Sequence, residues 1–485
     1  MGFHRDGLKG NNLKVLSEGE VEIIHQSSLV LLEKIGMKIH DNEILNLLKK
    51  SGCKVDFSTK IAFIPKKLIE NILKEIPNQV KLCGRDIKQD INLGDGKLYT
   101  RTTSGAPYIL DLDTQKQRKP TLEDLAQSVR IVDALPNIHG VSMVHMVPMD
   151  IPVNLIDLYT AQASFKNTTK HLFYVCHNEE LIESVIEIAT LIAGGEDKLA
   201  SRPLLCGFCE ATSPLQLDHS QAKLLINYTK RKLPVYTHSH PIAGLTSPVT
   251  LAGEIAQMNA ETLMVILIAK LINPGTPIIY GTSASVPNMR TGSTFSGAPE
   301  IGLLGMALVQ LAKKYNLPCD MSCGTDSKIA DAQASIEIIF TALPPILAGI
   351  DLLDISTIDT KLTFSLEQLV INNEIIGWIA RLLRGIIVDK EHLAIDLIRE
   401  VIHSGGSFID KEHTVKYFKE ELLNSNLMNR EPRSEWEENG SKTLQQKAQQ
   451  KVKEILKEHK PESLSEDIQK EIDKIILLAK KIVKQ

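Results

Sequence analysis

The stretch Leu204-Leu-Cys-Gly-Phe-Cys209, followed by a helical pattern over 216–230 and by Pro234-Val-Tyr-Thr-His238, decides the fold. The same order of elements continues, with a helix predicted over 251–271 and a further apolar run, Pro277-Ile-Ile-Tyr-Gly281. Short apolar runs are typical of buried parallel strands, and the longer amphipathic stretches between them are typical of crossover helices. The pattern therefore predicts parallel strands joined by right-handed helical connections.

The alternation extends outward in both directions. Further apolar runs lie at 140–147, 172–176, 318–323 and 346–355, and further helices are predicted at 155–165, 181–193, 301–315 and 331–342. Thr121-Leu-Glu-Asp124 is a capping box that opens another helix, which ends near Leu135-Pro-Asn137. Seven apolar runs are more strands than most open sheets contain. They predict the α/β class and a TIM (β/α)8 barrel with one strand unrecognised.

The two ends of the chain have a different pattern. Residues 1–120 combine helical spacing with short strands and hairpins over 81–119, including Lys97-Leu-Tyr-Thr100, which predicts an N-terminal helical, α+β cap. Residues 411–485 are charged and end in a Lys/Glu-rich stretch, which predicts a C-terminal helical extension packed on the barrel or on a neighbouring subunit. The catalytic β/α barrel is accordingly expected over 121–410.

Composition excludes several classes of protein. The 485 residues carry 55 Lys and Arg against 59 Asp and Glu, a formal net charge of -4. Without a basic cluster, nucleic acid is not expected as the main partner. The apolar stretch at 263–272 is too short for a membrane span, and Met1-Gly-Phe-His-Arg-Asp6 lacks the apolar core of a signal peptide. Seven irregularly spaced Cys indicate a reducing compartment, so a cytoplasmic protein is expected.

Polar residues gather directly after the predicted strands, where a β/α barrel carries its active site. They include Tyr236-Thr-His-Ser-His240, Met289-Arg-Thr-Gly292, Gly297-Ala-Pro-Glu300 and Met321-Ser-Cys-Gly-Thr-Asp-Ser-Lys328. Charged groups that converge on one face cost free energy unless they are hydrated, paired or used. The concentration therefore predicts an active site at this face.

Each of these features also has a simpler interpretation. Cys206 and Cys209 would face opposite sides of a strand, which favours inert buried thiols over a metal pair. His238 and His240 would point the same way and could ligate zinc with Cys323 or Glu210, although substrate hydrogen bonding is favoured. Asp326 and Asp331 could serve simply to begin a helix. Glu300 could serve simply to stabilise the first turn of one. Glycine-rich phosphate loops are absent, which argues against dinucleotide or P-loop chemistry.

A series of longer motifs is more specific. It comprises Gly105-Ala-Pro-Tyr-Ile-Leu-Asp111, Asp133-Ala-Leu-Pro-Asn-Ile138, Asn167-Thr-Thr-Lys170, Gly244-Leu-Thr-Ser-Pro-Val-Thr-Leu-Ala-Gly253, Asn259-Ala-Glu261, Gly297-Ala-Pro-Glu300 and Thr325-Asp-Ser-Lys328. With these motifs, from about residue 15 to residue 480, the chain resembles the trimethylamine methyltransferase family. Within that family it resembles the branch without pyrrolysine, the glycine betaine–corrinoid protein methyltransferases.

The resemblance implies a TIM barrel that passes a methyl group from a quaternary amine to cob(I)alamin on a separate corrinoid protein. It implies no tightly bound cofactor and no metal. The trimethylamine enzymes of the family carry pyrrolysine, expected near 324–333, where this chain has only standard residues. That difference favours a quaternary amine such as glycine betaine over trimethylamine.

The implied chemistry assigns roles to the polar residues. A quaternary ammonium favours aromatic faces, and a substrate carboxylate favours cationic or imidazole side chains. The expected catalytic residues are Asp326, Glu300 and His238. The expected substrate-binding residues are Arg290, His240, Tyr236, Tyr280, Phe295, Lys328 and Gln333.

Two other functions fit the same residues. One is a zinc-dependent corrinoid methyltransferase for methanol, thiol or methoxy substrates, with Cys206, His238 and Cys323 as ligands. The other is a non-catalytic betaine-binding or assembly protein. The long C-terminal helix favours self-association, which suggests a homo-oligomer.

Overall fold

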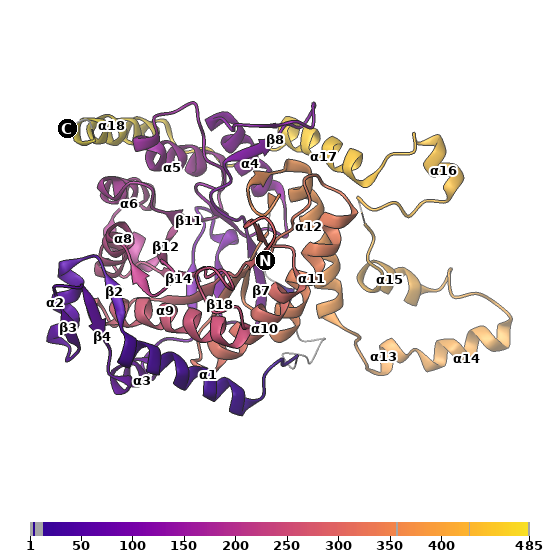
Figure 1. The fold of residues 1–485 in the computed structure, drawn as a ribbon. Coiled ribbons are helices and arrows are strands. Elements are labelled where there is room, and N and C mark those ends of the chain that lie inside the picture. The colour runs from indigo at the N-terminus through magenta and orange to yellow at the C-terminus, as the bar shows by residue number, and fades with distance from the viewer. Residues whose placement is uncertain (1–2, 5–12, 356, 426, 484–485) are drawn as a thin grey trace.

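The computed structural model describes residues 3–4, 13–355, 357–425 and 427–483, and at its centre eight parallel strands close into a barrel (Figure 1). β19 pairs with β7, with Asp354 opposite Arg101, and this pairing closes the ring. The predicted TIM barrel is therefore confirmed. In order around the barrel the strands are β7 (Lys97–Arg101), β10 (Gly140–Ser142), β11 (His171–Val175), β12 (Leu205–Ala211), β14 (Val235–Ser239), β15 (Ile278–Thr282), β18 (Cys319–Ser322) and β19 (Leu352–Asp354).

A helix follows each barrel strand and covers the outside of the barrel. The first begins where the capping box predicts, because the Thr121 side chain accepts from the Asp124 backbone N–H and the Asp124 side chain accepts from that of Thr121. In chain order the helices are α4 (Leu122–Ala134), α5 (Ile156–Asn167), α6 (Ile182–Ala193), α8 (His219–Lys230), α9 (Leu251–Ile272), α10 (Pro299–Lys314), α11 (Ala332–Ala348) and α12 (Leu366–Arg384).

The strand that the sequence pattern did not reveal is β7. Assigning Lys97-Leu-Tyr-Thr100 to a hairpin of the cap is wrong, because this segment pairs with β10 and β19 inside the barrel. The polar residues Thr100 and Arg101, both buried, interrupt the apolar run that marks the other strands. The barrel therefore starts at 97 rather than 121, and its last helix ends at Arg384 rather than near 410.

The apolar run at 346–355 is also divided differently from the prediction. α11 continues through Pro344 and Pro345 to Ala348, so only Leu352–Asp354 forms a strand.

A hairpin closes the N-terminal end of the barrel. It consists of β5 (Val80–Leu82) and β6 (Ile91–Leu93), which pair antiparallel. Its four apolar side chains are at most 3% exposed and belong to the same buried cluster as interior residues of the barrel wall. Among those are Tyr99 and Leu352, which lie toward the N-terminal ends of β7 and β19. Among the described residues, the hairpin therefore fills the N-terminal end of the barrel interior.

The rest of the N-terminal region packs against the barrel helices. α1 (Glu18–Val30), α2 (Asn42–Lys50) and α3 (Lys66–Leu73) contact α9, and β2 (Met37–Ile39), β4 (Ile61–Phe63) and β3 (Lys54–Asp56) form a small sheet with β13 (Gln216–Leu217). The segment 1–6, from which no signal peptide is expected, lies outside the described residues apart from the strand β1 (Phe3–His4).

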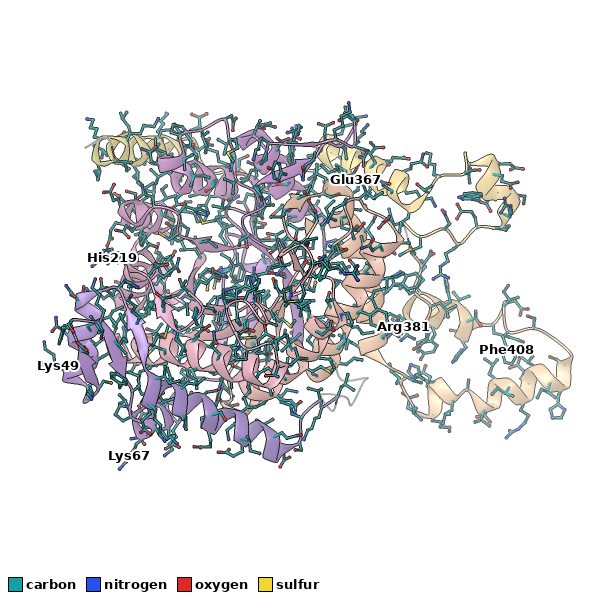
Figure 2. The ribbon with its side chains drawn as sticks, in the orientation of Figure 1. Lys49, Lys67, His219, Glu367, Arg381 and Phe408 are labelled. Atoms are coloured by element: carbon teal, nitrogen blue, oxygen red, sulfur yellow. The ribbon has the colours of Figure 1, made fainter. Side chains whose placement is uncertain are left out.

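The last two helices of the C-terminal extension pack on the barrel. α17 (Leu444–Glu458) contacts α12 and α4, and α18 (Glu466–Ile482) contacts α6 and α5. Between α12 and α17 the chain projects as an arm that carries α13 (Lys390–Leu393), α14 (Ile395–Ser404), α15 (Glu412–Glu421) and α16 (Arg433–Glu438) (Figure 1). Figure 2 shows Arg381 at the base of this arm and Phe408 far from the barrel. Arg381 Nη2 lies 3.1 Å from Glu421 Oε2 and ties α15 to α12.

One helix among the described residues, α9, is long and apolar enough to cross a membrane. Within its apolar window, 89% is buried inside the protein, between the strands and the surrounding helices. It is therefore a core helix of the barrel.

Candidate functional site

A buried ion pair lies in the barrel interior. Arg101 on β7 donates from Nε to Asp320 Oδ2 at 2.8 Å and from Nη2 to Asp320 Oδ1 at 3.0 Å. Tyr236 on β14 donates its hydroxyl to Asp320 Oδ1 at 2.7 Å and accepts from Arg101 Nη2 at 3.1 Å. Burial alone would lower the pKa of Arg101, but the charge of Asp320, reinforced by its hydrogen bonds and by the charge of Asp354, outweighs it and raises that pKa. The guanidinium therefore stays charged.

A second carboxylate, Asp354 on β19, lies beside the pair. Its Oδ2 is 3.6 Å from Arg101 Nη2 and accepts hydrogen bonds from Thr103 and Ser322. Its Oδ1 is buried and has no hydrogen-bond partner among the described residues. Two carboxylates facing one guanidinium give the interior a formal excess of negative charge. A buried carboxylate oxygen without a partner is costly, so this position suits a cationic ligand.

Aromatic rings surround the cluster. The Arg101 guanidinium lies 5.1 Å from the Phe173 ring centroid and 4.9 Å from that of Tyr236. Phe208 on β12 lies 4.9 Å from Tyr236 and 4.6 Å from His238, measured between centroids. Tyr236, predicted to bind substrate, therefore does face the interior, although its hydroxyl is engaged by Asp320.

Nearer the mouth, two predicted histidines lie over this layer. His238 Nδ1 is 3.3 Å from Glu210 Oε1, and His238 is 6% exposed. His240 forms a 2.9 Å hydrogen bond with the Ser285 hydroxyl, and its ring lies 6.0 Å from that of His238. Burial, reinforced by the nearby charge of Lys361, lowers the pKa of His240 to about 3. His240 is therefore neutral at neutral pH and can act as a hydrogen-bonding group.

Tyr280 does not belong to this site. Its side chain lies on the outer face of β15, where its hydroxyl donates to Asn259 Oδ1 on α9 at 2.8 Å and its ring packs near Tyr315. The alternation along β15 instead turns Ile279 into the barrel interior. The substrate-binding role predicted for Tyr280 is wrong.

Three predicted residues after β18 brace loops. Asp326 accepts the backbone N–H of Ser296 at 2.8 Å and of Gly297 at 3.1 Å, and the Thr360 hydroxyl at 2.9 Å. These bonds give Asp326 a positioning role, and its predicted catalytic role stays a prediction. Lys328, 67% exposed, pairs with Asp359, and the exposed Gln333 donates to Glu337. Both side chains are engaged by neighbouring loop or helix groups rather than by the interior cluster.

Arg290, Phe295 and Glu300 lie on a projection after β15. Arg290 is exposed at the turn between β16 (Val286–Pro287) and β17 (Thr294–Phe295). Phe295 is half-buried on β17, and Glu300 lies in the first turn of α10, where an acidic side chain offsets unpaired N–H groups. Within the described part of the chain, no hydrogen bond or ion pair connects these three side chains to the Arg101 cluster. Their predicted roles stay predictions.

The zinc ligand set is not assembled. In the described ranges, no group of three or more His, Cys, Asp and Glu side chains is arranged to hold a metal ion. Cys206 faces the interior, whereas the Cys209 thiol donates outward to the Gln221 carbonyl of α8. The two cysteines thus face opposite sides, as predicted, and burial raises the pKa of both thiols. Cys323 donates to the Asp354 carbonyl instead of joining His238.

Sequence reasoning missed the charged centre of the site. Arg101, Asp320 and Asp354 are the buried charged residues of their strands, in Lys97-Leu-Tyr-Thr-Arg101, Pro318-Cys-Asp-Met-Ser322 and Leu352-Leu-Asp354. A charge inside a buried strand must be paired or used. That rule would have selected all three.

Comparisons with known proteins agree with this geometry. A family model described as trimethylamine methyltransferase (MTTB) matches residues 7–482. A trimethylamine methyltransferase from Desulfitobacterium hafniense is 34% identical over 444 residues, which is 91% of this chain and 89% of the relative. A glycine betaine methyltransferase from another strain of that species is 31% identical over 435 residues, 89% and 90% of the two chains.

Among solved structures, the Methanosarcina barkeri monomethylamine methyltransferase aligns over 94% of this chain and 98% of its own, with 11% identity. The TM-score of 0.44 is too low for that likeness to bear on fold or function. The family model and the sequence relatives, by contrast, span nearly the whole chain. The protein belongs to the trimethylamine methyltransferase family.

Proposed function

We propose that this protein takes a methyl group from a quaternary amine, with a betaine as the favoured substrate, and passes it to cob(I)alamin on a partner corrinoid protein. The observation that carries the proposal is the unpartnered Asp354 Oδ1, buried in an aromatic-lined interior with more carboxylates than cations. The membership in a family of amine methyltransferases supports it.

This interior suits a quaternary ammonium better than an ordinary amine. A quaternary nitrogen has no N–H to donate, so it is held by net charge and by aromatic faces, each contributing about 0.5–2 kcal/mol. Asp354 supplies the charge, and Phe208 supplies an aromatic face between His238 and Tyr236. When the N–CH3 bond breaks, both electrons stay on nitrogen and a neutral tertiary amine leaves. No proton has to be supplied, so the reaction needs no acid catalyst. His238 and Glu210 are therefore assigned to positioning the substrate.

The barrel mouth fits the approach of a large partner. Cob(I)alamin, when bound, supplies the nucleophile for the methyl carbon. The loops after five barrel strands each expose large apolar side chains, 44–78% exposed. These residues, called the mouth rim below, are Met149 and Val153 after β10, Leu245 and Val249 after β14, Met289 after β15, Ile329 after β18 and Leu362 after β19. Apolar side chains around a polar opening favour a docking protein.

The choice of a quaternary amine over trimethylamine rests on the residues of the chain. The resemblance implies pyrrolysine in the trimethylamine enzymes, whereas every residue here is one of the standard amino acids. The 34% and 31% identities to relatives with different substrate names do not separate the two substrates.

The test is an anaerobic absorbance assay of cob(I)alamin with glycine betaine, carnitine, proline betaine, choline and trimethylamine, with and without a corrinoid protein. Methylcobalamin formed from a quaternary amine and not from trimethylamine supports the proposal. No methyl transfer with the corrinoid protein present contradicts it. A betaine-induced rise in Tm in that case would identify a binding protein.

Two further properties are part of this proposal. The arm exposes large apolar residues, among them Ile386, Val388, Ile402 and Ile409 at 71–83%, which supports self-association. Sedimentation of the intact protein tests for an oligomer. We place the reaction in the cytoplasm, because all seven cysteines are free and buried.

A further inference from the structure

A strained turn follows the last barrel strand. It connects β20 (Thr357–Ile358) to β21 (Thr363–Phe364), and its residues Asp359, Thr360 and Lys361 have φ values of 55°, 56° and 67°. Residues other than glycine rarely adopt this left-handed backbone conformation, and three consecutive residues in it are rarer still. Such backbone persists only where the surroundings impose it, and it concentrates at functional sites.

Four contacts impose the turn, all from the loop after β18. The backbone N–H groups of Asp359 and Thr360 donate to the carbonyls of Ser327 at 2.7 Å and Thr325 at 2.9 Å. The Thr360 hydroxyl donates to Asp326 Oδ1 at 2.9 Å, and Lys328 Nζ lies 2.7 Å from Asp359 Oδ1. Asp326 and Lys328 thus hold in place the turn that carries Lys361.

The Lys361 side chain brings a positive charge to the barrel mouth. It is half-buried, and no carboxylate of the described residues forms an ion pair with it. Its charge acts on groups at the ends of three strands, because it favours the ionised form of Glu210 and Cys323 and disfavours that of His240. A lone ammonium therefore lies above an interior with a formal excess of negative charge.

We infer that Lys361 anchors the carboxylate of a zwitterionic quaternary amine whose ammonium end lies toward Asp354. The inference rests on the proposed methyl transfer and names its substrate class: carboxylated quaternary amines, selected over choline and trimethylamine. Asp354 ends β19, and Lys361 follows it on the turn that packs against the loop after β18, so the order of the two charges complements the charge separation of a betaine.

Equilibrium binding to the isolated protein tests this anchor, with glycine betaine and choline as ligands. In Lys361→Met, the Kd for glycine betaine should rise about 10- to 100-fold, since a hydrogen bond between charged groups is lost, while the Kd for choline changes less than about threefold. Lys361→Arg should restore most of the affinity. The matched control is Lys116→Met, which removes the same charge from the exposed turn between β8 (Tyr108–Leu110) and β9 (Gln117–Arg118) of the same small sheet and should leave both affinities unchanged.

Lys361→Gly separates anchoring from folding. Glycine adopts positive φ readily, so this variant should unfold at a Tm a few degrees above wild type while still losing betaine affinity. A structural role alone would not combine a higher Tm with weaker binding of the carboxylated ligand only.

The outcomes separate this inference from the proposed function. Equal losses for glycine betaine and choline in Lys361→Met would overturn the anchor, as would a wild type that demethylates choline but no carboxylated amine; methyl transfer would then stand. Lys361-dependent betaine binding without any methyl transfer to a corrinoid would keep the anchor and overturn the function.

Discussion

Arg101 and Asp320 form a two-pronged ion pair over β19, the strand that lies between theirs, with Nε–Oδ2 and Nη2–Oδ1 distances of 2.8 and 3.0 Å. The pair fixes the guanidinium, which lies 3.6 Å from Asp354, and so sets the surroundings of the unpartnered carboxylate oxygen. The ligand site is thus supported by side chains that no substrate has to touch.

Removing one member of this pair should strongly destabilise the protein. Arg101→Leu leaves Asp320 and Asp354 buried without their cation, so we expect a loss of about 3–5 kcal/mol of unfolding free energy. The double variant Arg101→Leu with Asp320→Leu should be less destabilised than Arg101→Leu alone. Urea unfolding measures both, and an additive loss in the double variant would contradict the coupling.

Asp354→Asn should weaken every quaternary amine alike. The substitution keeps the shape but removes the charge facing the ammonium, so the Kd of glycine betaine and of choline should each rise about tenfold. Titration calorimetry compares the two ligands. Unchanged choline affinity would mean that Asp354 is not the counter-charge of the cation.

Charges in the mouth rim should impair the partner and spare the substrate. Leu245 and Met289 are 56% and 78% exposed, so their replacement by Asp should not affect folding. We expect the KM for the corrinoid protein to rise at least about tenfold, because a desolvated apolar contact becomes charged. The Kd of glycine betaine and the rate with free cob(I)alamin should stay at wild-type values; a parallel fall in all three would refute a docking role.

Buried His145 and His171 should each contribute a loss of stability as the pH drops from about 6.5 toward 4. Burial lowers the pKa of His145 and His171 to about 4, whereas unfolded histidine titrates near 6.5. Between these values the unfolded chain binds protons that the folded chain excludes, so each histidine reduces the unfolding free energy by about 1.4 kcal/mol per pH unit. Urea unfolding at pH 7.5, 6 and 5 checks the slope. His145→Gln should reduce the dependence of the unfolding free energy on pH relative to wild type. A slope identical to that of the wild type would contradict the prediction.

Lys170 should matter for stability and not for catalysis. Its ammonium donates to the carbonyls of Val132, Leu135 and Ile138 at 2.6–2.7 Å and closes the end of α4 at the N-terminal side of the barrel. Lys170→Met leaves these buried acceptors without a donor, which should cost about 3 kcal/mol of unfolding free energy. The kcat and the substrate Kd, measured well below the Tm, should be unchanged; a selective loss of kcat would point to another role.

The barrel could be predicted from sequence because seven of its strands lie in short, mostly apolar runs between helices. The strand Lys97–Arg101 could not, because Thr100 and Arg101 give it the appearance of a surface hairpin. The missing strand is thus the one that carries the central cation of the site. Local hydrophobicity fails at such a position, since the partners that make burial tolerable come from distant strands.

The site was predicted at the correct end of the barrel but only partly with the correct residues. Tyr236 and His238 share one face of β14 and His240 directly follows the strand, so spacing alone placed them together. Tyr280 follows the same kind of run, yet its strand phase turns it outward to Asn259. The bracing role of Asp326 depends on Ser296, Gly297 and Thr360, which approach only after folding.

The hairpin of β5 and β6 gives the reaction a compulsory sequence of events. Because its apolar side chains fill the N-terminal end of the barrel in the described part of the chain, we expect small molecules to enter at the C-terminal end, the face to which the proposed corrinoid protein would dock. In the proposed reaction the amine would then enter before the partner docks, and its demethylated product would leave after the partner departs. Steady-state kinetics should therefore show an ordered pattern in which excess partner slows turnover by occluding the vacant enzyme.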